Sequence, residues 1–109
     1  MNVKFEYIYR DAGNFKNWGE VVFANPNGIA VDDVVSLTEK ALIDKTFFSD
    51  ILFFNASKAG VPDLRFDKHI PDLDHDWHTV SALLPTDELP SDPRNIEEFI
   101  ESLRQTALA

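Results

Sequence analysis

The chain has 109 residues, a formal net charge of −9, 44% hydrophobic residues and no cysteine. This length and composition predict one domain over residues 1–109, and the lack of cysteine excludes disulfides, thiolate zinc sites and cysteine nucleophiles. No apolar run approaches the ~18 residues of a membrane span, and Glu6 interrupts what would be the apolar part of a signal peptide. We therefore expect a soluble cytoplasmic protein that does not bind membranes.

The first part of the chain predicts two paired strands. Side chains alternate over residues 3–9, as in a strand with one buried face. The apolar residues on that face are Val3, Phe5, Tyr7 and Tyr9. Turn-forming residues follow at 11–14, and a stretch rich in strand-forming residues runs from Trp18 to Ala24. We therefore expect an antiparallel hairpin or meander.

Residues 31–43 predict an amphipathic helix. Asp32 and Asp33 fall in its first turn, where the helix dipole favours negative charge. Its apolar stripe consists of Val31, Val34, Leu37 or Thr38, Ala41 and Leu42. The apolar run at 46–54 is too short for periodicity to separate a helix from a strand, and we favour a strand.

Short elements are expected in the middle of the chain. Asn55 and Gly60 are suited to cap a single helical turn between them. Residues 61–66 predict a short edge strand with Pro62 near its start. Residues 77–84 predict a further strand. The apolar residues expected to share one of its faces are Val80, Ala82 and Leu84.

The last predicted element is a helix that begins after a proline-rich segment. Pro85, Pro90 and Pro93 exclude regular structure between them. Asp92 is suited to cap the helix, with Pro93 at its first position. The apolar stripe consists of Ile96, Phe99, Ile100 and Leu103. Together the elements predict an α+β fold, with a small, mainly antiparallel sheet of about four strands and two amphipathic helices packed on one face.

All three histidines of the chain lie within residues 69–78, among several aspartates. Imidazole and carboxylate groups are ligands of divalent cations such as zinc or manganese. The residues of this predicted metal site are His69, Asp74, His75, Asp76 and His78. The alternative is a loop whose aspartates bond local backbone groups and which binds no metal.

Catalytic motifs are scarce in the chain. A metal-dependent hydrolase could use the histidine cluster, or His78 could act as a base that Asp74 or Asp76 orients. The sequence contains no Gly-x-Ser-x-Gly elbow, no phosphate-binding glycine loop and no cysteine. An enzyme is therefore disfavoured, and the sequence assigns no catalytic and no cofactor-binding residue. The only cofactor that it suggests is a divalent metal.

The negative charge is concentrated in residues 72–101. Nine carboxylates and a single base, Arg94, give this segment −8 of the formal −9. Such a region repels nucleic acid and attracts basic protein surfaces. The carboxylates expected to contact a partner are Asp72, Asp74, Asp87, Glu88, Glu97, Glu98 and Glu101. The alternative is a solvated acidic face that only keeps the protein soluble.

Three groups of residues carry a resemblance to known proteins. They are Phe5–Asn14 with Lys16 and Trp18-Gly19, then Gly60–Leu64, and then Asp74–His78. This pattern is similar to a family of small uncharacterised bacterial proteins and is spread over most of the chain. The resemblance implies one compact α+β domain of bacterial, cytoplasmic origin. It implies no activity and no catalytic residue.

Functions of different classes follow from these patterns. The first is a non-catalytic binding or regulatory module whose acidic residues 72–101 engage a basic protein partner. The second is a metal-binding protein or metal-dependent hydrolase built on residues 69–78. A third interpretation is a homo-oligomer that docks through exposed phenylalanines within residues 47–54.

Overall fold

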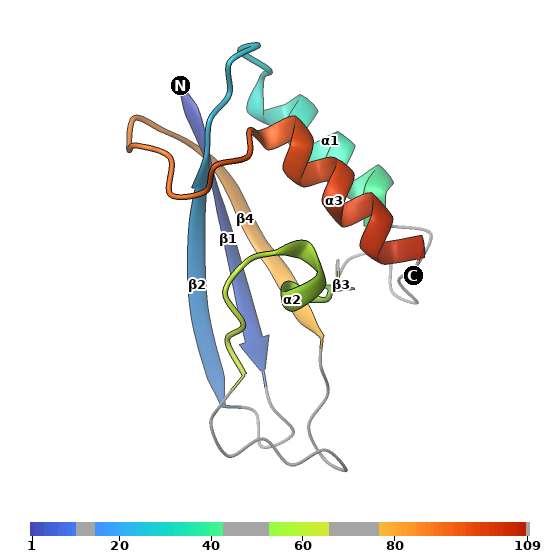
Figure 1. The fold of residues 1–109 in the computed structure, drawn as a ribbon. Coiled ribbons are helices and arrows are strands. Elements are labelled where there is room, and N and C mark those ends of the chain that lie inside the picture. Colours follow the sequence, from blue (N-terminus) through green and yellow to red (C-terminus); the bar gives the residue numbers. More distant parts are fainter. Residues whose placement is uncertain (11–14, 43–52, 66–76, 109) are drawn as a thin grey trace.

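The structure, a computed structural model, describes residues 1–10, 15–42, 53–65 and 77–108 (Figure 1). Its elements are β1 (Asn2–Arg10), β2 (Lys16–Phe23), α1 (Val31–Leu42), β3 (Phe53–Phe54), α2 (Ala56–Ala59), β4 (His78–Thr86) and α3 (Ile96–Leu108). The predicted turn at 11–14 and most of the apolar run at 46–54 lie outside the described residues. The end of that run forms the short strand β3, as favoured.

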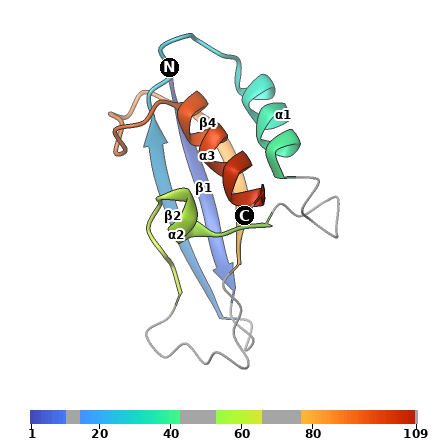
Figure 2. The same cartoon turned by 45° about the vertical axis from the view of Figure 1, so that its right-hand side comes forward.

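The strands pair into one antiparallel sheet in the order β2-β1-β4-β3. The three long strands β2, β1 and β4 make up most of it, because β3 contributes only two residues. Figures 1 and 2 show α1, α2 and α3 on the same side of this sheet. The predicted α+β class with a small antiparallel sheet is therefore confirmed, and three helices rather than two lie on that face.

The face of the sheet that points to the helices forms the core. The four side chains of β1 predicted to share a buried face are 1% exposed or less: Val3, Phe5, Tyr7 and Tyr9. The ring of Phe5 contacts that of Phe99 of α3 edge-on at 4.8 Å, and Phe99 stacks on Phe23 of β2 at 4.2 Å. Phe99 thus joins the helix layer to two strands through a large buried surface.

The first helix confirms the predicted amphipathic pattern and its acidic first turn. Thr38, and not Leu37, completes the buried stripe, since Leu37 is 40% exposed whereas Thr38 is buried. The Thr38 hydroxyl donates a hydrogen bond of 2.8 Å to the Val34 carbonyl. This bond satisfies the hydroxyl inside the core, so a polar residue can occupy an apolar position of the stripe.

A β-bulge in β4 overturns one prediction for that strand. Tyr7 lies opposite Val80 and Glu6 lies opposite Ala82, so Ser81 is an extra residue without a partner in β1. Beyond it Leu83, and not Leu84, packs against the core. The prediction that Val80, Ala82 and Leu84 share a face is wrong, because one inserted residue reverses the alternation. The strand also continues past the predicted end, through Pro85 to Thr86.

The segment after α2 is not the predicted edge strand. Residues 61–65 form no strand, and their backbone groups bond to side chains of the sheet. The Tyr7 hydroxyl donates to the Pro62 carbonyl at 2.7 Å, and the Asn17 side chain donates to the Leu64 carbonyl at 3.1 Å. Side chains therefore replace a strand partner here, which satisfies the polar backbone without a ladder.

The cap of α3 also differs from the prediction. The Asn95 side chain accepts the Glu98 N–H at 2.8 Å, and the Glu98 side chain accepts the Asn95 N–H at 3.0 Å. This reciprocal pair is a capping box, so Asn95 caps the helix. Asp92 and Pro93 lie before the helix, and the Asp92 carboxylate accepts hydrogen bonds from Arg94 instead.

The short helix α2 has the two caps that the sequence predicts. The Asn55 side chain accepts the Lys58 N–H at 3.0 Å, and Gly60 closes the turn with a φ of 76°. A positive φ favours glycine because a side chain would be crowded there. None of the three described helices is both long and apolar enough to cross a membrane.

Candidate functional site

The predicted site residues are only partly within the described residues. His69, Asp72, Asp74, His75 and Asp76 all lie in 66–76, outside them. Of the predicted metal ligands, the structure describes His78 alone. Of the predicted partner contacts, it describes Asp87, Glu88, Glu97, Glu98 and Glu101.

His78, the first residue of β4, is buried among aromatic rings. Its side chain is 1% exposed, and its ring centroid lies 5.1 Å from that of Tyr9 and 5.9 Å from that of Phe54. Its Nε2 accepts the backbone N–H of Leu64 at 3.0 Å. A nitrogen that accepts a hydrogen bond carries no proton, so this contact places a lone pair on Nε2.

The carboxylate of Asp63 lies beside this imidazole. Its Oδ1 is 3.5 Å from Nε2 of His78, a distance that suits an ion pair only if that nitrogen is protonated. The bond from the Leu64 N–H leaves no proton on Nε2 for such an ion pair. The hydrogen bonds to the carboxylate come from Arg65. The backbone N–H of Arg65 donates to Oδ1 at 2.9 Å, and its Nε donates to Oδ2 at 2.7 Å.

The ionisation of Asp63 reflects these contacts. Burial acts to raise the pKa of its carboxyl, but the hydrogen bonds and the charge of Arg65 outweigh burial and hold that pKa below its ordinary value. Asp63 is therefore an ionised carboxylate at neutral pH. The Ser57 hydroxyl donates a longer bond, 3.3 Å, to the same Oδ2.

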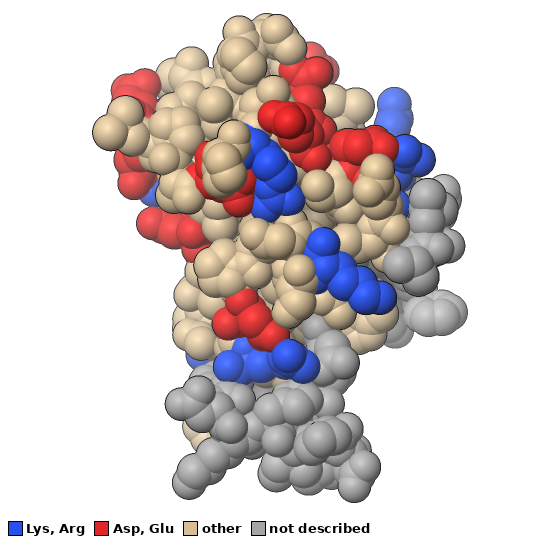
Figure 3. Space-filling model, viewed as in Figure 1, with Lys and Arg blue, Asp and Glu red and all other residues tan. Residues whose placement is uncertain are grey.

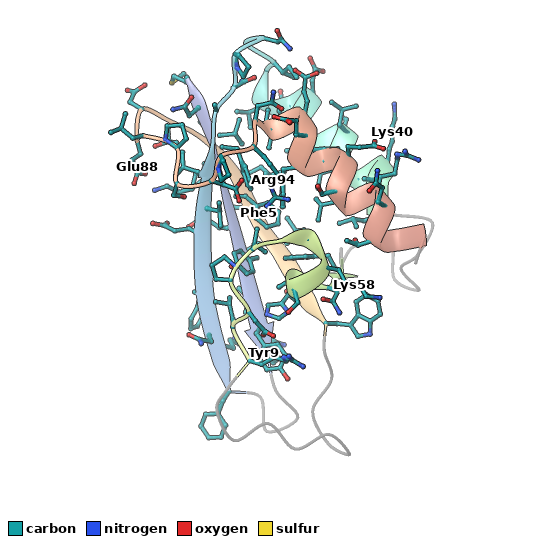
Figure 4. The ribbon with its side chains drawn as sticks, in the orientation of Figure 1. Phe5, Tyr9, Lys40, Lys58, Glu88 and Arg94 are labelled. Atoms are coloured by element: carbon teal, nitrogen blue, oxygen red, sulfur yellow. The ribbon has the colours of Figure 1, made fainter. Side chains whose placement is uncertain are left out.

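These groups line a shallow pocket of about 210 Å³ between α2 and the start of β4. Its lining residues are Asn55, Ala56, Ser57, Lys58, Asp63, Arg65 and His78. Figure 4 shows Lys58 on α2 above the end of β1, where Tyr9 lies. Among the described residues that line the pocket, the Ser57 hydroxyl bonds to Asp63 and not to His78, so these two side chains do not form the nucleophile–base contact of a hydrolase.

Described residues of the three segments that carry the family resemblance contact one another beside the pocket. Tyr7 reaches Pro62 through its hydroxyl, and Leu64 reaches His78 through its N–H. Gly19 lies opposite Tyr7 in β2, and a Cβ there would lie 2.9 Å from Cδ2 of Leu64. The described residues Tyr7, Gly19, Leu64 and His78 thus bring parts of the three segments together, while the family assignment stays a prediction.

The metal site stays a prediction as well. In the part of the chain that the structure describes, no three histidine, aspartate or glutamate side chains are grouped to hold a metal ion. His78 uses Nε2 to accept the Leu64 N–H, so this nitrogen cannot bind a metal in the same arrangement. The other four predicted ligands lie outside the described residues.

Carboxylates gather at the end of the molecule where α1 and α3 begin. The two helices run side by side in the same direction, so their first turns lie at the same end (Figures 1 and 2). We call this group the acidic end, and its members are Asp32, Asp33, Glu97 and Glu98. All four are exposed, and Figure 3 shows red side chains over this end of the molecule.

Sequence reasoning missed half of the acidic end. The sequence predicts Glu97 and Glu98 as partner contacts, whereas for Asp32 and Asp33 it indicates only a favourable position near the helix dipole. The Asn27 side chain, just before α1, donates to Glu97, which ties the two helix starts together. Acidic first turns in both predicted helices were the available signal, but the parallel packing that brings them together is not a local property.

The remaining predicted carboxylates are distributed differently. Glu88 forms an ion pair with Lys4 of β1, on the opposite side of the sheet from the helices. Glu101 forms one with Arg104 within α3. Hydrogen bonds from these two bases lower the pKa of both glutamates, although each is about half exposed. These carboxylates are therefore partly neutralised by local partners and do not join the acidic end.

The pocket and the acidic end are the two polar features from which a function can be inferred. Comparison of the chain with protein-family models, with curated proteins and with solved structures finds no match.

Proposed function

We propose that the protein is a non-catalytic binding module of the bacterial cytoplasm that engages a basic protein surface through its acidic end. The observation that carries the proposal is the convergence of four exposed carboxylates from the first turns of two parallel helices. Among the described residues, Asp32, Asp33 and Glu97 form no ion pair with a lysine or arginine. Their charge therefore remains available to a partner.

The helices that carry the acidic end also hold it in place. Each helix start bears roughly half a positive charge from its dipole, which stabilises nearby carboxylates. Two half charges cannot neutralise four carboxylates, so a negative field remains at this end. Such a field steers a basic protein into contact and raises the association rate, with a strong dependence on ionic strength.

The test compares two sets of charge-neutralising variants. Asp33→Asn with Glu97→Gln removes two charges from the acidic end and leaves the Glu98 cap intact. Glu39→Gln with Asp87→Asn removes two exposed charges elsewhere and serves as the matched control. A partner is first captured from the source cell at low salt and identified, and its association rate with each purified variant is then measured over a salt series.

We expect the acidic-end variant to lower the association rate, and the control to leave it nearly unchanged. The difference should shrink as salt is added, because exposed charges are screened within about 10 Å at 0.1 M salt. Equal rates for both variants, or binding that does not change with salt, would contradict the proposal. An identified partner without a basic surface would contradict it too.

A further inference from the structure

The sheet has a second face, which no helix of the described residues covers (Figures 1 and 2). Since Phe5, Tyr7 and Tyr9 point into the core, the residues between them in β1 point the other way. We call this surface the open face. Its residues, with their neighbours on β2 and β4, are Lys4, Glu6, Ile8, Arg10, Lys16, Trp18, Glu20, Thr79, Ala82 and Leu84.

The strand register arranges these side chains in rows that cross the strands. Arg10 lies opposite Lys16 and forms a basic row. Two residues further along the strands, Ile8 of β1 lies between Trp18 of β2 and Thr79 of β4, and these three form an apolar row. The third joins Glu6 to Glu20, with Ala82 beyond, and forms an acidic row. The open face therefore changes sign from one side of its apolar row to the other.

The exposure of Trp18 points to an unfilled apolar contact in the apolar row. Trp18 is 63% exposed, although the burial of a large aromatic side chain is strongly favourable. It lies at the β2 end of the apolar row, beside Ile8 and with a charged row on each side. An exposed apolar residue framed by charges is the usual composition of a protein interface, with an apolar centre and a polar rim.

Two copies of the open face are complementary to each other. A two-fold axis along the apolar row turns one copy over onto the other, so Trp18 meets Trp18 and the strand directions reverse. The same rotation places the basic row of each copy over the acidic row of the other. Lys16 then faces Glu20 across the interface, and Arg10 faces Glu6. Isologous dimers are built from self-complementary patches of this kind.

Charge also selects this face over others for contact between copies. The chain carries −9, so most of its surface repels a second copy. The two charged rows hold Arg10 and Lys16 against Glu6 and Glu20, and Lys4 beyond them pairs with Glu88, so the open face has a formal charge of zero. Glu20 also lies 3.6 Å from Lys4, yet its side chain remains 54% exposed and can reach a second base.

We propose that the open face is a dimer interface whose occupant is a second copy of this chain. The contact is small, since three strands about 4.8 Å apart and rows about 7 Å apart give only a few hundred Å² per copy, below the ~800 Å² of a standard interface. The dimer is therefore weak and forms as the protein concentration rises. The proposal is independent of the acidic end, which lies on the helix side.

Sedimentation of the full chain from micromolar to millimolar concentration measures the dimer directly. We expect the average mass to rise toward twice the chain mass. Lys16→Glu turns attraction into repulsion at two symmetry-related contacts and should weaken dimerisation about tenfold at low salt. The double variant Lys16→Glu with Glu20→Lys exchanges the two charges and should restore it.

Two further variants keep the test decisive. Lys40→Glu makes the same charge change on α1, away from the open face, and should dimerise as the unmodified chain does. Trp18→Thr removes the largest apolar contact of the interface and should weaken the dimer at both low and high salt. A monomer at every concentration, a double variant that stays as weak as Lys16→Glu, or an equal loss in Lys40→Glu would each overturn the proposal.

Discussion

Arg94 links distant parts of the chain through a single side chain. Its guanidinium donates to the Ala59 carbonyl at 2.6 Å and to the Asp92 carboxylate at 2.9 and 3.0 Å. It also lies over the rings of Phe23 and Phe99, at 5.7 and 5.2 Å from their centroids. Figure 4 shows Arg94 between α2 and the start of α3. Charge-assisted hydrogen bonds and ring contacts of this kind are stronger than neutral ones.

Replacing Arg94 is expected to destabilise the fold strongly. Arg94→Met should lower the free energy of unfolding by about 2–4 kcal/mol, because it leaves the largely buried Asp92 carboxylate and the Ala59 carbonyl without their donor. Arg104→Met is the matched control, since the Arg104 guanidinium is about half exposed and, in the part of the chain that the structure describes, forms its ion pair with Glu101 of the same helix. Urea unfolding of both variants measures the difference. Equal losses would contradict the assigned role of Arg94.

The raised pKa of Tyr7 predicts that the free energy of unfolding falls at alkaline pH. Burial and the nearby charge of Asp63 raise the pKa of Tyr7 to about 12, whereas an unfolded chain has a tyrosine pKa of about 10. The folded state therefore keeps its proton where the unfolded state releases it. This contribution to stability is complete below pH ~10 and is lost as the pH rises from ~10 through ~12.

The free energy of unfolding, measured from pH 8 to pH 12, checks this dependence on Tyr7. Tyr7→Phe should be less stable at neutral pH, because it loses the bond to the Pro62 carbonyl. Its stability should nevertheless fall less steeply above about pH 10, because the group that titrates is gone. Parallel curves for the two proteins would show that the Tyr7 phenol does not titrate on unfolding.

At the scale of the element, α2 shows how caps can stabilise a helix of a single turn. Asn55 satisfies the start of the turn, and Gly60 donates its N–H back into it at the end. Arg94 then bonds to the Ala59 and Gly60 carbonyls, which the turn itself leaves without donors. A turn this short is unstable alone, so its stability depends on these contacts.

Two glycines with similar backbone angles separate strain from crowding. Gly60→Ala should lower stability through its positive φ of 76° and because the new Cβ would lie 3.2 Å from Nη2 of Arg94. Gly28 has a φ of 60°, and no atom lies within 4 Å of the position that a new Cβ would occupy. Gly28→Ala therefore measures the backbone strain alone. We expect a loss of about 1 kcal/mol for Gly28→Ala and a larger loss for Gly60→Ala. Thermal unfolding of both compares them, and equal losses would exclude crowding by Arg94.

Local sequence patterns predict much of the fold. They fail where a contact between residues far apart in the sequence determines the local structure. The alternation in β1, the stripe of α1 and the caps of α2 depend on residues close in sequence, and all were predicted. The bulge at Ser81 depends on how β4 pairs with β1, so alternation alone could not reveal it. Asp92 has the chemistry of a cap, but its carboxylate binds Arg94, and Asn95 caps α3 instead.

The candidate site was harder to predict for the same reason. His78 was identified as a residue of interest, but its neighbours Leu64 and Asp63 come from a segment that the sequence predicted as an edge strand. The sequence shows that carboxylates are dense in 72–101, yet it cannot show which of them find a base. Lys4 reaches Glu88 only because β1 lies beside the segment that follows β4.

For the whole molecule, uneven charge predicts how stability depends on salt. The acidic end joins four carboxylates, and the chain as a whole carries −9, so folding brings like charges together. Raising the salt concentration from about 10 mM to about 200 mM screens this repulsion and should raise the melting temperature by a few degrees. Asp33→Asn with Glu97→Gln should show a smaller rise. A melting temperature that falls with salt would indicate that attractive pairs dominate instead.

The place of β1 between β2 and β4 has a consequence for synthesis of the protein. On the ribosome, β1 and β2 emerge before β4 and can pair with each other at once. The other edge of β1 pairs with β4, which is complete only when the chain has been extended to Thr86. Until then the nascent sheet has an unpaired edge and an uncovered row of aromatic rings. Both are surfaces through which an incomplete chain aggregates or binds chaperones.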